Sequence, residues 1–129
     1  MGPIPNNLCS KSKTLQHLFL GGNNNLGTIP KALMHLSNLQ QLDISNNYLH
    51  GSIPANLDSL ESLSDLYLHN NSLTGTIPPK LGNLNILKTL SLYHNLLTGA
   101  IPPELGNLKV QNNSNFQVSI ELNKCVINE

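Results

Sequence analysis

Apolar and polar residues follow a block pattern along this chain that returns every 24 residues. The block is clearest at 39–54, Leu-Gln-Gln-Leu-Asp-Ile-Ser-Asn-Asn-Tyr-Leu-His-Gly-Ser-Ile-Pro. The columns in phase are Leu39/Leu63/Leu87, Leu42/Leu66/Leu90, Ile44/Leu68/Leu92, Asn47/Asn71/Asn95, Leu49/Leu73/Leu97, Gly51/Gly75/Gly99, Ile53/Ile77/Ile101 and Pro54/Pro78/Pro102. A period of this length is the signature of a solenoid, in which coils of chain stack on one another. The predicted fold class is therefore an α/β solenoid.

Each block predicts a short strand, a turn and a short helical segment. Residues 41–45 alternate between polar and apolar, as expected for a strand with one buried face. Strands stacked at a fixed period form a parallel sheet along one side. We expect Asn47 and its equivalents to bond backbone groups of the following turn, and Gly51 to sit where the chain bends with little room. Pro54 then opens a helical turn, from which Leu57 packs inward.

We interpret the chain as one domain, 1–129, of stacked repeats. The predicted units are a partial repeat at 2–14, full repeats at 15–38, 39–62, 63–86 and 87–110, and a degenerate terminal repeat at 111–129. Leu26 comes one residue later than its equivalent Leu49, so we expect local distortion of that turn. After Leu108 the phase slips by four residues. We interpret 111–114 as an inserted loop and 117–121 as a fifth strand, with a frayed tail as the alternative.

The chain starts inside a coil, without the polar capping unit that usually protects the end of such a stack. This favours a fragment, or a protein that tolerates a bare end. Cys9 and Cys125 are separated by four or more strands, at about 4.8 Å per strand. Since a disulfide needs α carbons within about 7 Å, we predict that they do not pair within one chain. Burial as small core residues and an intermolecular bridge both remain open.

Charge and hydropathy exclude several classes of function. The seven basic and seven acidic residues cancel and are scattered, which argues against nucleic-acid binding and against a membrane-surface patch. No apolar run approaches the roughly 18 residues of a membrane span. The first residues, Met-Gly-Pro-Ile-Pro, lack the charged and apolar regions of a signal peptide.

The repeat LxxLxLxxNxLxGxIPxxLxxLxx resembles that of plant-type leucine-rich repeats. These form the ectodomains of receptor-like kinases and receptor-like proteins, and the polygalacturonase-inhibiting proteins. The resemblance covers residues 2–108 and, more weakly, 115–125. It implies a leucine-rich-repeat right-handed superhelix with the parallel sheet on the concave side, short 3-10 or helical turns on the convex side, and an extracellular or cell-surface location. The paired cysteines and tryptophan of the usual N-terminal cap, a kinase domain and a membrane span are absent from this sequence, so receptor signalling is not implied for this chain alone.

Packing fixes the inner columns, so recognition must reside in the variable strand positions. The outward columns are His17/Gln41/Asp65/Thr89, Phe19/Asp43/Tyr67/Ser91, Gly21/Ser45/His69/Tyr93 and Gly22/Asn46/Asn70/His94. Three of the chain's few aromatic side chains fall on this surface, and tyrosine is favoured in binding hot spots. The predicted ligand-binding residues are Phe19, Asp43, Asp65, Tyr67, His69, Ser91, Tyr93 and His94. The alternative is that these residues are exposed on the sheet without binding a ligand.

Other chemistry finds less support in the sequence. The five histidines lack the Cys or carboxylate spacing of a zinc site, so we expect no metal and no cofactor. Asp65 and His69 share one strand face, but no nucleophile, base and orienting group can be placed together, so we expect no enzyme. Two triplets fit the N-glycosylation pattern, at Asn70 and Asn112. In an asparagine-rich chain such triplets are explained as readily by chance as by glycosylation.

We therefore predict a non-enzymatic recognition module from an extracellular receptor-like ectodomain, which binds a protein or peptide through its concave sheet. Contact with a co-receptor, or self-association through the uncapped ends, is a further expectation. The alternative, from the same resemblance, is an inhibitor of a cell-wall-degrading enzyme. A third option is a structural or ice-binding repeat. Ice binding requires a regular threonine ladder, and Thr28, Thr74, Thr76 and Thr98 form only broken columns.

Overall fold

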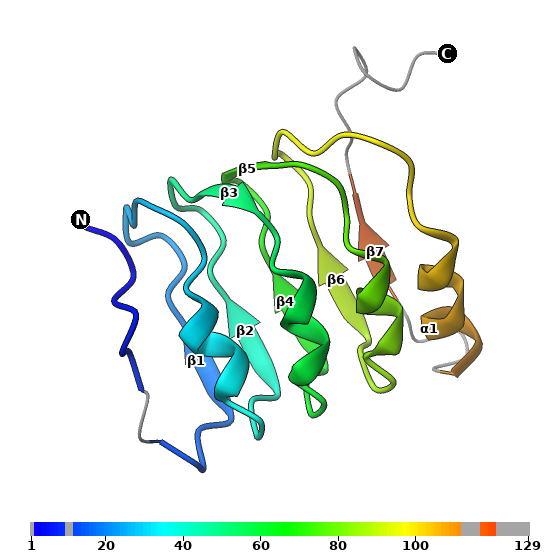
Figure 1. Ribbon diagram of the computed structural model, residues 1–129, viewed down its shortest axis with the longest axis horizontal. Helices are drawn as coiled ribbons and strands as arrows, with labels where there is room; N and C mark the ends of the chain where they lie inside the picture. The colour runs from blue at the N-terminus through cyan, green and yellow to red at the C-terminus, as the bar shows by residue number, and fades with distance from the viewer. Residues whose placement is uncertain (1, 10–11, 112–116, 121–129) are drawn as a thin grey trace.

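The computed structural model describes residues 2–9, 12–111 and 117–120, without the side chains of 109–111. Its coils lie side by side and contribute strands to one five-stranded sheet (Figure 1). The strands, in sheet order, are β1 (His17–Phe19), β2 (Gln41–Asp43), β4 (Asp65–Tyr67), β6 (Thr89–Ser91) and β7 (Gln117–Ser119). All neighbouring pairs are parallel. The predicted solenoid with a parallel sheet is confirmed.

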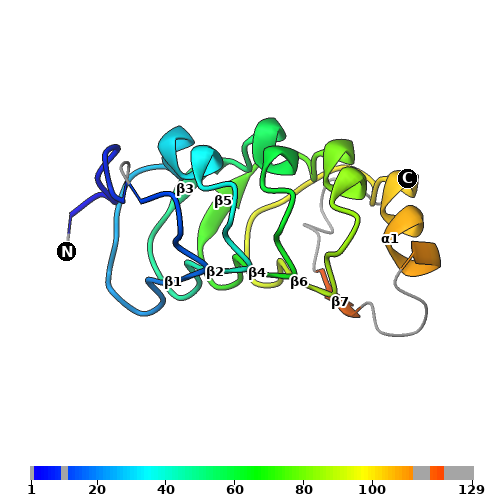
Figure 2. The same ribbon diagram turned by 90° about the horizontal axis from the view of Figure 1, so that it is seen from below.

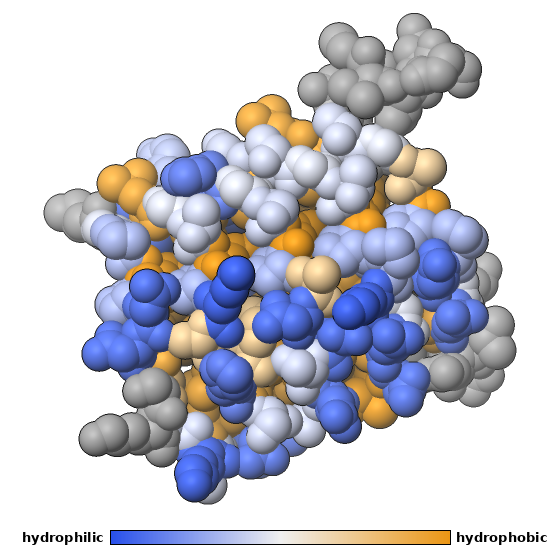
Figure 3. All heavy atoms as spheres, viewed as in Figure 1, coloured by the Kyte–Doolittle hydropathy of each residue, from blue (hydrophilic) through white to orange (hydrophobic). Residues whose placement is uncertain are grey.

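Short helices occupy the side opposite this sheet, as Figure 2 shows. They are the 3-10 helices η1 (Lys31–His35), η2 (Ala55–Ser59), η3 (Pro79–Asn83) and η4 (Pro103–Leu105), followed by α1 (Gly106–Gln111). Strands β3 (His50–Ser52) and β5 (Ser72–Thr74) form a separate parallel pair. In the space-filling view from the helix side, hydrophilic residues cover much of the surface (Figure 3). The convex side therefore carries the polar turns.

The prolines of the repeat do not start these helices, contrary to the sequence prediction. Pro30, Pro54, Pro78 and Pro102 are N-cap residues in an extended conformation, with ψ between 127° and 132°. Each helix begins at the next residue. The fixed φ of proline suits the extended cap as well as it suits the first helical position, so the pattern misplaced the boundary by one residue.

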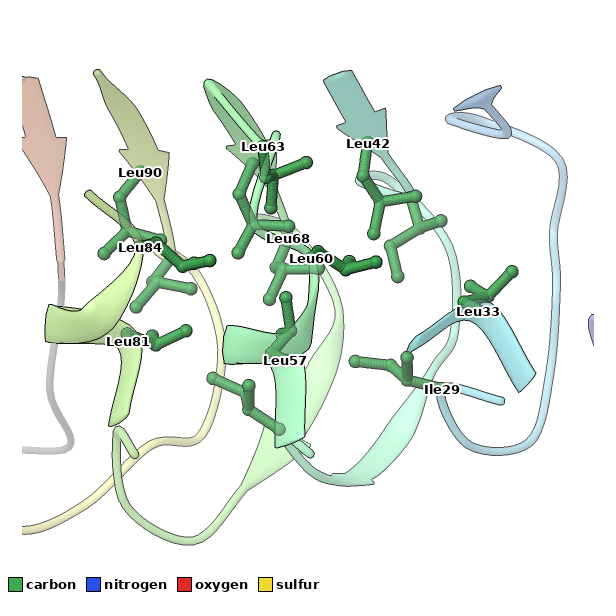
Figure 4. Packing of buried hydrophobic residues seen from close by; sticks show 14 of the residues in the cluster. Ile29, Leu33, Leu42, Leu57, Leu60, Leu63, Leu68, Leu81, Leu84 and Leu90 are labelled. Carbon is green, nitrogen blue, oxygen red and sulfur yellow. The ribbon is translucent and has the colours of Figure 1, made fainter. Parts of the chain in front are cut away.

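The strand register makes the inner leucines stack. Leu42 pairs with Leu66, and Leu66 pairs with Leu90, so each coil covers the leucine of its neighbour. Leucines from the helical turns, such as Leu57 and Leu81, point toward those of the strands (Figure 4). All five side chains are buried. Because each coil supplies part of its neighbour's interior, no single coil could bury its own apolar face.

An asparagine ladder holds successive coils together on one side of this core. The Asn71 amide Nδ2 donates to the carbonyls of Ile44 and Leu68, at 3.0 and 3.1 Å. Its Oδ1 accepts from the backbone N–H of Leu49, at 3.0 Å. Asn95 repeats this arrangement one coil further along. Backbone groups that the strands leave unpaired are thereby satisfied, as the sequence predicts.

The glycine column is explained by contacts between coils. Gly51 has φ of +81°, a conformation that other residues adopt with strain. A Cβ at this position would also lie 3.0 Å from Cγ2 of Thr28, in the preceding coil. Gly99 and Thr76 repeat the contact at 2.9 Å. Glycine is therefore required both by backbone conformation and by close packing.

The first full repeat shows the predicted distortion. Leu26 is 48% exposed, whereas its equivalent Leu49 is fully buried. Asn23, which lies 24 residues before Asn47, is also exposed, so the buried ladder begins at Asn47. Oδ1 of Asn47 accepts from the backbone N–H groups of Asn23 and Asn25, at 3.1 and 2.9 Å. Cys9, in the preceding partial coil, is a half-buried free cysteine.

The C-terminal coil confirms the predicted change of phase. Leu90 pairs with Val118, four residues beyond the position that the 24-residue period would give. The fifth strand is therefore present, at Gln117–Ser119. One boundary was wrong, because α1 extends through Gln111, which we had assigned to the inserted loop. The predictions for Asn112, Cys125 and the remainder of the terminal repeat lie outside the described residues.

Candidate functional site: the concave face

We use the name concave face for the outward positions of β1, β2, β4 and β6 together with the two columns that follow these strands, Gly21/Ser45/His69/Tyr93 and Gly22/Asn46/Asn70/His94. Register places Phe19, Asp43, Tyr67 and Ser91 in one row across four strands. Asp65 lies two residues before Tyr67 on β4. The structure therefore brings the predicted residues of the three strands β2, β4 and β6 together, while Phe19 lies on the outer strand β1, 61% exposed and stacked on His17.

Four rings form a continuous line from Tyr67, the last residue of β4, to His94, three residues beyond the end of β6. The rings of Tyr67 and His69 meet edge to face, with centroids 6.1 Å apart. His69 stacks on Tyr93 with centroids 4.6 Å apart and an interplanar angle of 10°. Tyr93 then meets His94 at 5.1 Å and 75°. These contacts fix the rings relative to one another, although all four remain at least partly exposed.

Two serines predicted on this face are buried, which corrects the sequence assignment. Ser91 is 6% and Ser45 2% exposed. Both are short side chains whose hydroxyl groups bond to larger neighbours. Oγ of Ser91 lies 2.9 Å from Nδ1 of His69, and Oγ of Ser45 donates to Oδ1 of Asp43 at 2.6 Å. Ser91 therefore orients the His69 ring instead of offering its own hydroxyl group to a ligand.

The contact between Ser91 and His69 places a hydroxyl group beside a base, which the sequence had not brought together. A serine nucleophile must reach its substrate and needs a base that a third group orients. Here the Ser91 hydroxyl group is buried, and both hydrogen bonds to Asp43 come from Ser45 and not from His69. The arrangement is thus suited to positioning an imidazole ring within a binding surface.

The two aspartates of the face are held by polar neighbours. Oδ2 of Asp65 accepts from Nε2 of Gln41 at 3.1 Å and from Oγ of Ser64 at 2.9 Å. Burial by itself raises the pKa of Asp65, but hydrogen bonds from Gln41, Thr89 and Ser64, with the charge of Lys88, lower it overall. Asp65 is therefore ionised at neutral pH.

Burial has the larger influence on His69. It lowers the pKa of this imidazole from its ordinary value of 6.5, the Asp43 carboxylate opposes the shift, and the neighbouring His94 adds to it. The net direction is downward, so His69 is neutral at neutral pH. The concave face then carries the negative charge of Asp65 near the neutral ring of His69.

Sequence reasoning missed the backbone conformation at the end of each strand. Asn46, Asn70 and His94 have φ near +55°, in the left-handed region that asparagine tolerates better than most residues. The recurrence of Asn or Gly in this column was the available signal. Nδ2 of Asn70, the glycosylation candidate, donates to Oδ1 of Asn46 at 2.8 Å. A glycan at Asn70 would therefore sit on the rim of the concave face.

No three His, Cys, Asp or Glu side chains among the described residues converge as metal ligands would. In the same ranges, no helix has the length and apolar character needed to cross a membrane.

The repeats match a family model described as Leucine Rich Repeat, at 14–36, 38–60, 62–84 and 87–108. The comparison with curated proteins gives no match.

Several solved structures are similar to this chain. The ectodomain of the Arabidopsis thaliana receptor kinase GASSHO1/SCHENGEN3, in complex with CASPARIAN STRIP INTEGRITY FACTOR 2, is 34% identical with a TM-score of 0.83, over 95% of this chain and 14% of the receptor chain.

Two further structures resemble this chain. The ectodomain of the Arabidopsis receptor kinase HAESA, in complex with an IDA peptide hormone ligand, is 30% identical with a TM-score of 0.84, over 95% of this chain and 24% of its own. A plant ice-binding protein is 33% identical with a TM-score of 0.86, over 95% and 39%. This chain thus spans less than two thirds of each structure. It belongs to the leucine-rich repeat family, and its repeats are of the plant type.

Proposed function

We propose that this chain is a non-enzymatic recognition module that binds a protein or peptide through its concave face, as part of an extracellular or cell-surface protein. The observation that carries the proposal is the line of four rings from Tyr67 to His94. Partly exposed tyrosines that neighbouring rings hold in place provide large contact areas at little entropic cost, and tyrosine is enriched among residues that dominate binding energy.

Three properties support an extended ligand. The rings belong to two coils, so a ligand that touches all of them must cross at least β4 and β6. Polar groups neighbour the rings, because Asp43 pairs with Tyr67, Asp65 precedes Tyr67 on the same strand and Asn70 follows His69. Similar ectodomains have been solved in complex with a peptide hormone ligand or with CASPARIAN STRIP INTEGRITY FACTOR 2. We infer that a peptide, or an extended segment of a protein, lies across the strands.

The test is binding by variants at the two tyrosines of the face. Peptides selected against the wild-type chain from a random display library supply the ligand. We expect Tyr67→Ala and Tyr93→Ala each to weaken binding by roughly tenfold or more, as for a hot-spot tyrosine. Tyr48→Ala is the matched control, because Tyr48 is 59% exposed and lies outside the concave face.

Thermal unfolding should show that all three variants are folded. If both concave-face variants bind selected peptides as tightly as the wild type does, the proposed site is wrong. A parallel pull-down with cell-wall polygalacturonases distinguishes the inhibitor function, since capture of such an enzyme through Tyr67 or Tyr93 would identify the partner as an enzyme.

A further inference from the structure

We propose that the ligand of the concave face presents a cationic side chain, arginine or lysine, which contacts the Tyr67 ring between Asp43 and Asp65. This inference rests on the proposed function, because it names the chemistry of the ligand for the same face. It deepens that function by predicting which peptides the face accepts and which it rejects.

Both carboxylates lie next to Tyr67, one on the adjacent strand and one on the same strand. Asp43 is the partner of Tyr67 on the adjacent strand, at a strand spacing of about 4.8 Å. Asp65 precedes Tyr67 by two residues on β4 and so points to the same face, about 7 Å along the strand. A guanidinium group or ammonium group over the tyrosine ring is within reach of both acids. Cations are attracted to the faces of aromatic rings.

The aspartates are already held in place. The backbone N–H and the hydroxyl group of Ser45 both donate to Oδ1 of Asp43, at 3.0 and 2.6 Å. Gln41 and Ser64 hold Asp65 in the same way. His17 extends this polar row, with Nδ1 2.9 Å from Oε1 of Gln41. Binding therefore needs little reordering of the acids, which favours affinity.

The balance of charge on the face favours a cation. The outward strand columns contain Asp43 and Asp65 but no lysine, and the whole chain contains no arginine. Arginine recognises carboxylate groups through bidentate hydrogen bonds, so an acidic ligand would find no such partner here. Lys88 precedes β6 and acts on Asp65 by its charge, which places one positive charge at the rim. Complementary charge would select basic peptides and disfavour acidic ones.

The neighbouring histidine makes this preference dependent on pH. The groups that face His69 are Asp43, Tyr67, Ser91, Tyr93 and His94. Burial lowers the pKa of His69 despite the opposing Asp43, and His94 lowers it further, so the ring is neutral at neutral pH. Protonation of His69 in acid would add positive charge beside the cation and weaken its binding.

The experiment uses 12-residue peptide pools that are random except for one central residue, fixed as arginine, citrulline or glutamate. Citrulline has the shape of arginine without its charge. We expect wild-type protein to bind the arginine pool roughly three- to tenfold more tightly than the citrulline pool, as for one exposed ion pair with one cation–π contact. The glutamate pool should bind most weakly. Acidification from pH 7.5 to 5.5 should reduce the arginine preference.

The variant D43N/D65N should lose the preference, so that it binds the arginine pool no more tightly than the citrulline pool. Asparagine retains an oxygen that can accept the Ser45 and Gln41 bonds, so the fold should persist. The control E61Q/E104Q removes the same amount of charge at exposed positions outside the concave face and should keep the preference. Equal binding of all pools by the wild type, or preference for glutamate, would overturn the cationic ligand and leave peptide recognition standing. Absence of binding to every pool would reject both proposals.

Discussion

The inner and outer positions of the same three strands differ sharply. They are adjacent in the sequence, yet the inner positions of β2, β4 and β6 are all leucine, fully buried and in register. The outer positions beside them are Asp43, Tyr67 and Ser91, which share neither size nor charge. Each inner side chain must fit against its equivalent in the next coil, whereas outer side chains in the same row need not match one another in size.

This contrast separates stability from recognition. The stability of the interior is a sum of contributions from each coil and from its contacts with its two neighbours. A change at one inner position should therefore disturb both adjacent coils. Changes on the concave face should leave the fold intact and alter binding. The following predictions test the separation, beginning with the largest effect on stability.

Leu66→Ala should produce the greatest loss. Leu66 is fully buried between Leu42 and Leu90, and its truncation leaves a cavity that the stacked neighbours cannot close. We expect the free energy of unfolding to fall by about 3 kcal/mol, measured by urea denaturation. Leu96→Ala is the control, since Leu96 is 52% exposed and should change stability by less than about 1 kcal/mol. Similar losses from both would contradict the stacked interior.

Asn71→Ala should come next. The change removes the acceptor for the Leu49 N–H and the donor for the carbonyls of Ile44 and Leu68. Leaving such backbone groups unsatisfied should lower the free energy of unfolding by about 2 kcal/mol. Amide hydrogen exchange should locate the damage in the coil that contains Leu49 as well as in its own coil. Asn85→Ala, at an exposed turn position, is the control. A loss confined to the mutated coil would show that the ladder does not couple coils.

The smallest effect concerns His69 and pH. Because the folded-state pKa lies below 6.5, the unfolded chain binds more protons than the folded chain as the pH falls through that value. Stability from the neutral ring is therefore complete above pH 6.5 and is lost as the pH falls through the folded pKa. Unfolding measured between pH 7.5 and 5 should show a steeper decline for the wild type than for His69→Gln. Identical slopes would mean that the ring is not desolvated by the fold.

The fold could be predicted to a large extent because its interactions repeat. Leucine, asparagine and glycine columns in phase required equivalent environments, and the structure provides them for Leu66, Asn71 and Gly51. The regular pattern breaks down beside the partial first coil, where Asn23 and Leu26 are both exposed. The distortion at Leu26 was expected from its position one residue late, whereas the exposure of Asn23 did not follow from the pattern.

The candidate site was predictable only in part. Alternation along a strand identifies which side chains point outward, so Tyr67, His69 and Tyr93 could be placed on one face. It does not indicate how deeply short side chains lie among larger ones, which is why Ser45 and Ser91 were expected to be exposed. The role of the whole set in ligand binding stays a prediction that the tyrosine variants will test.

The sequence by itself determined the coil, its period, its buried columns and the parallel order of the strands, because these depend on spacing along the chain. The stacking of His69 on Tyr93 and its contact with Ser91 were decided by the tertiary structure. These relations join residues of different coils, at distances and angles that depend on how side chains share space once the coils have stacked. The repeat pattern would be the same whichever residues occupied the outward positions.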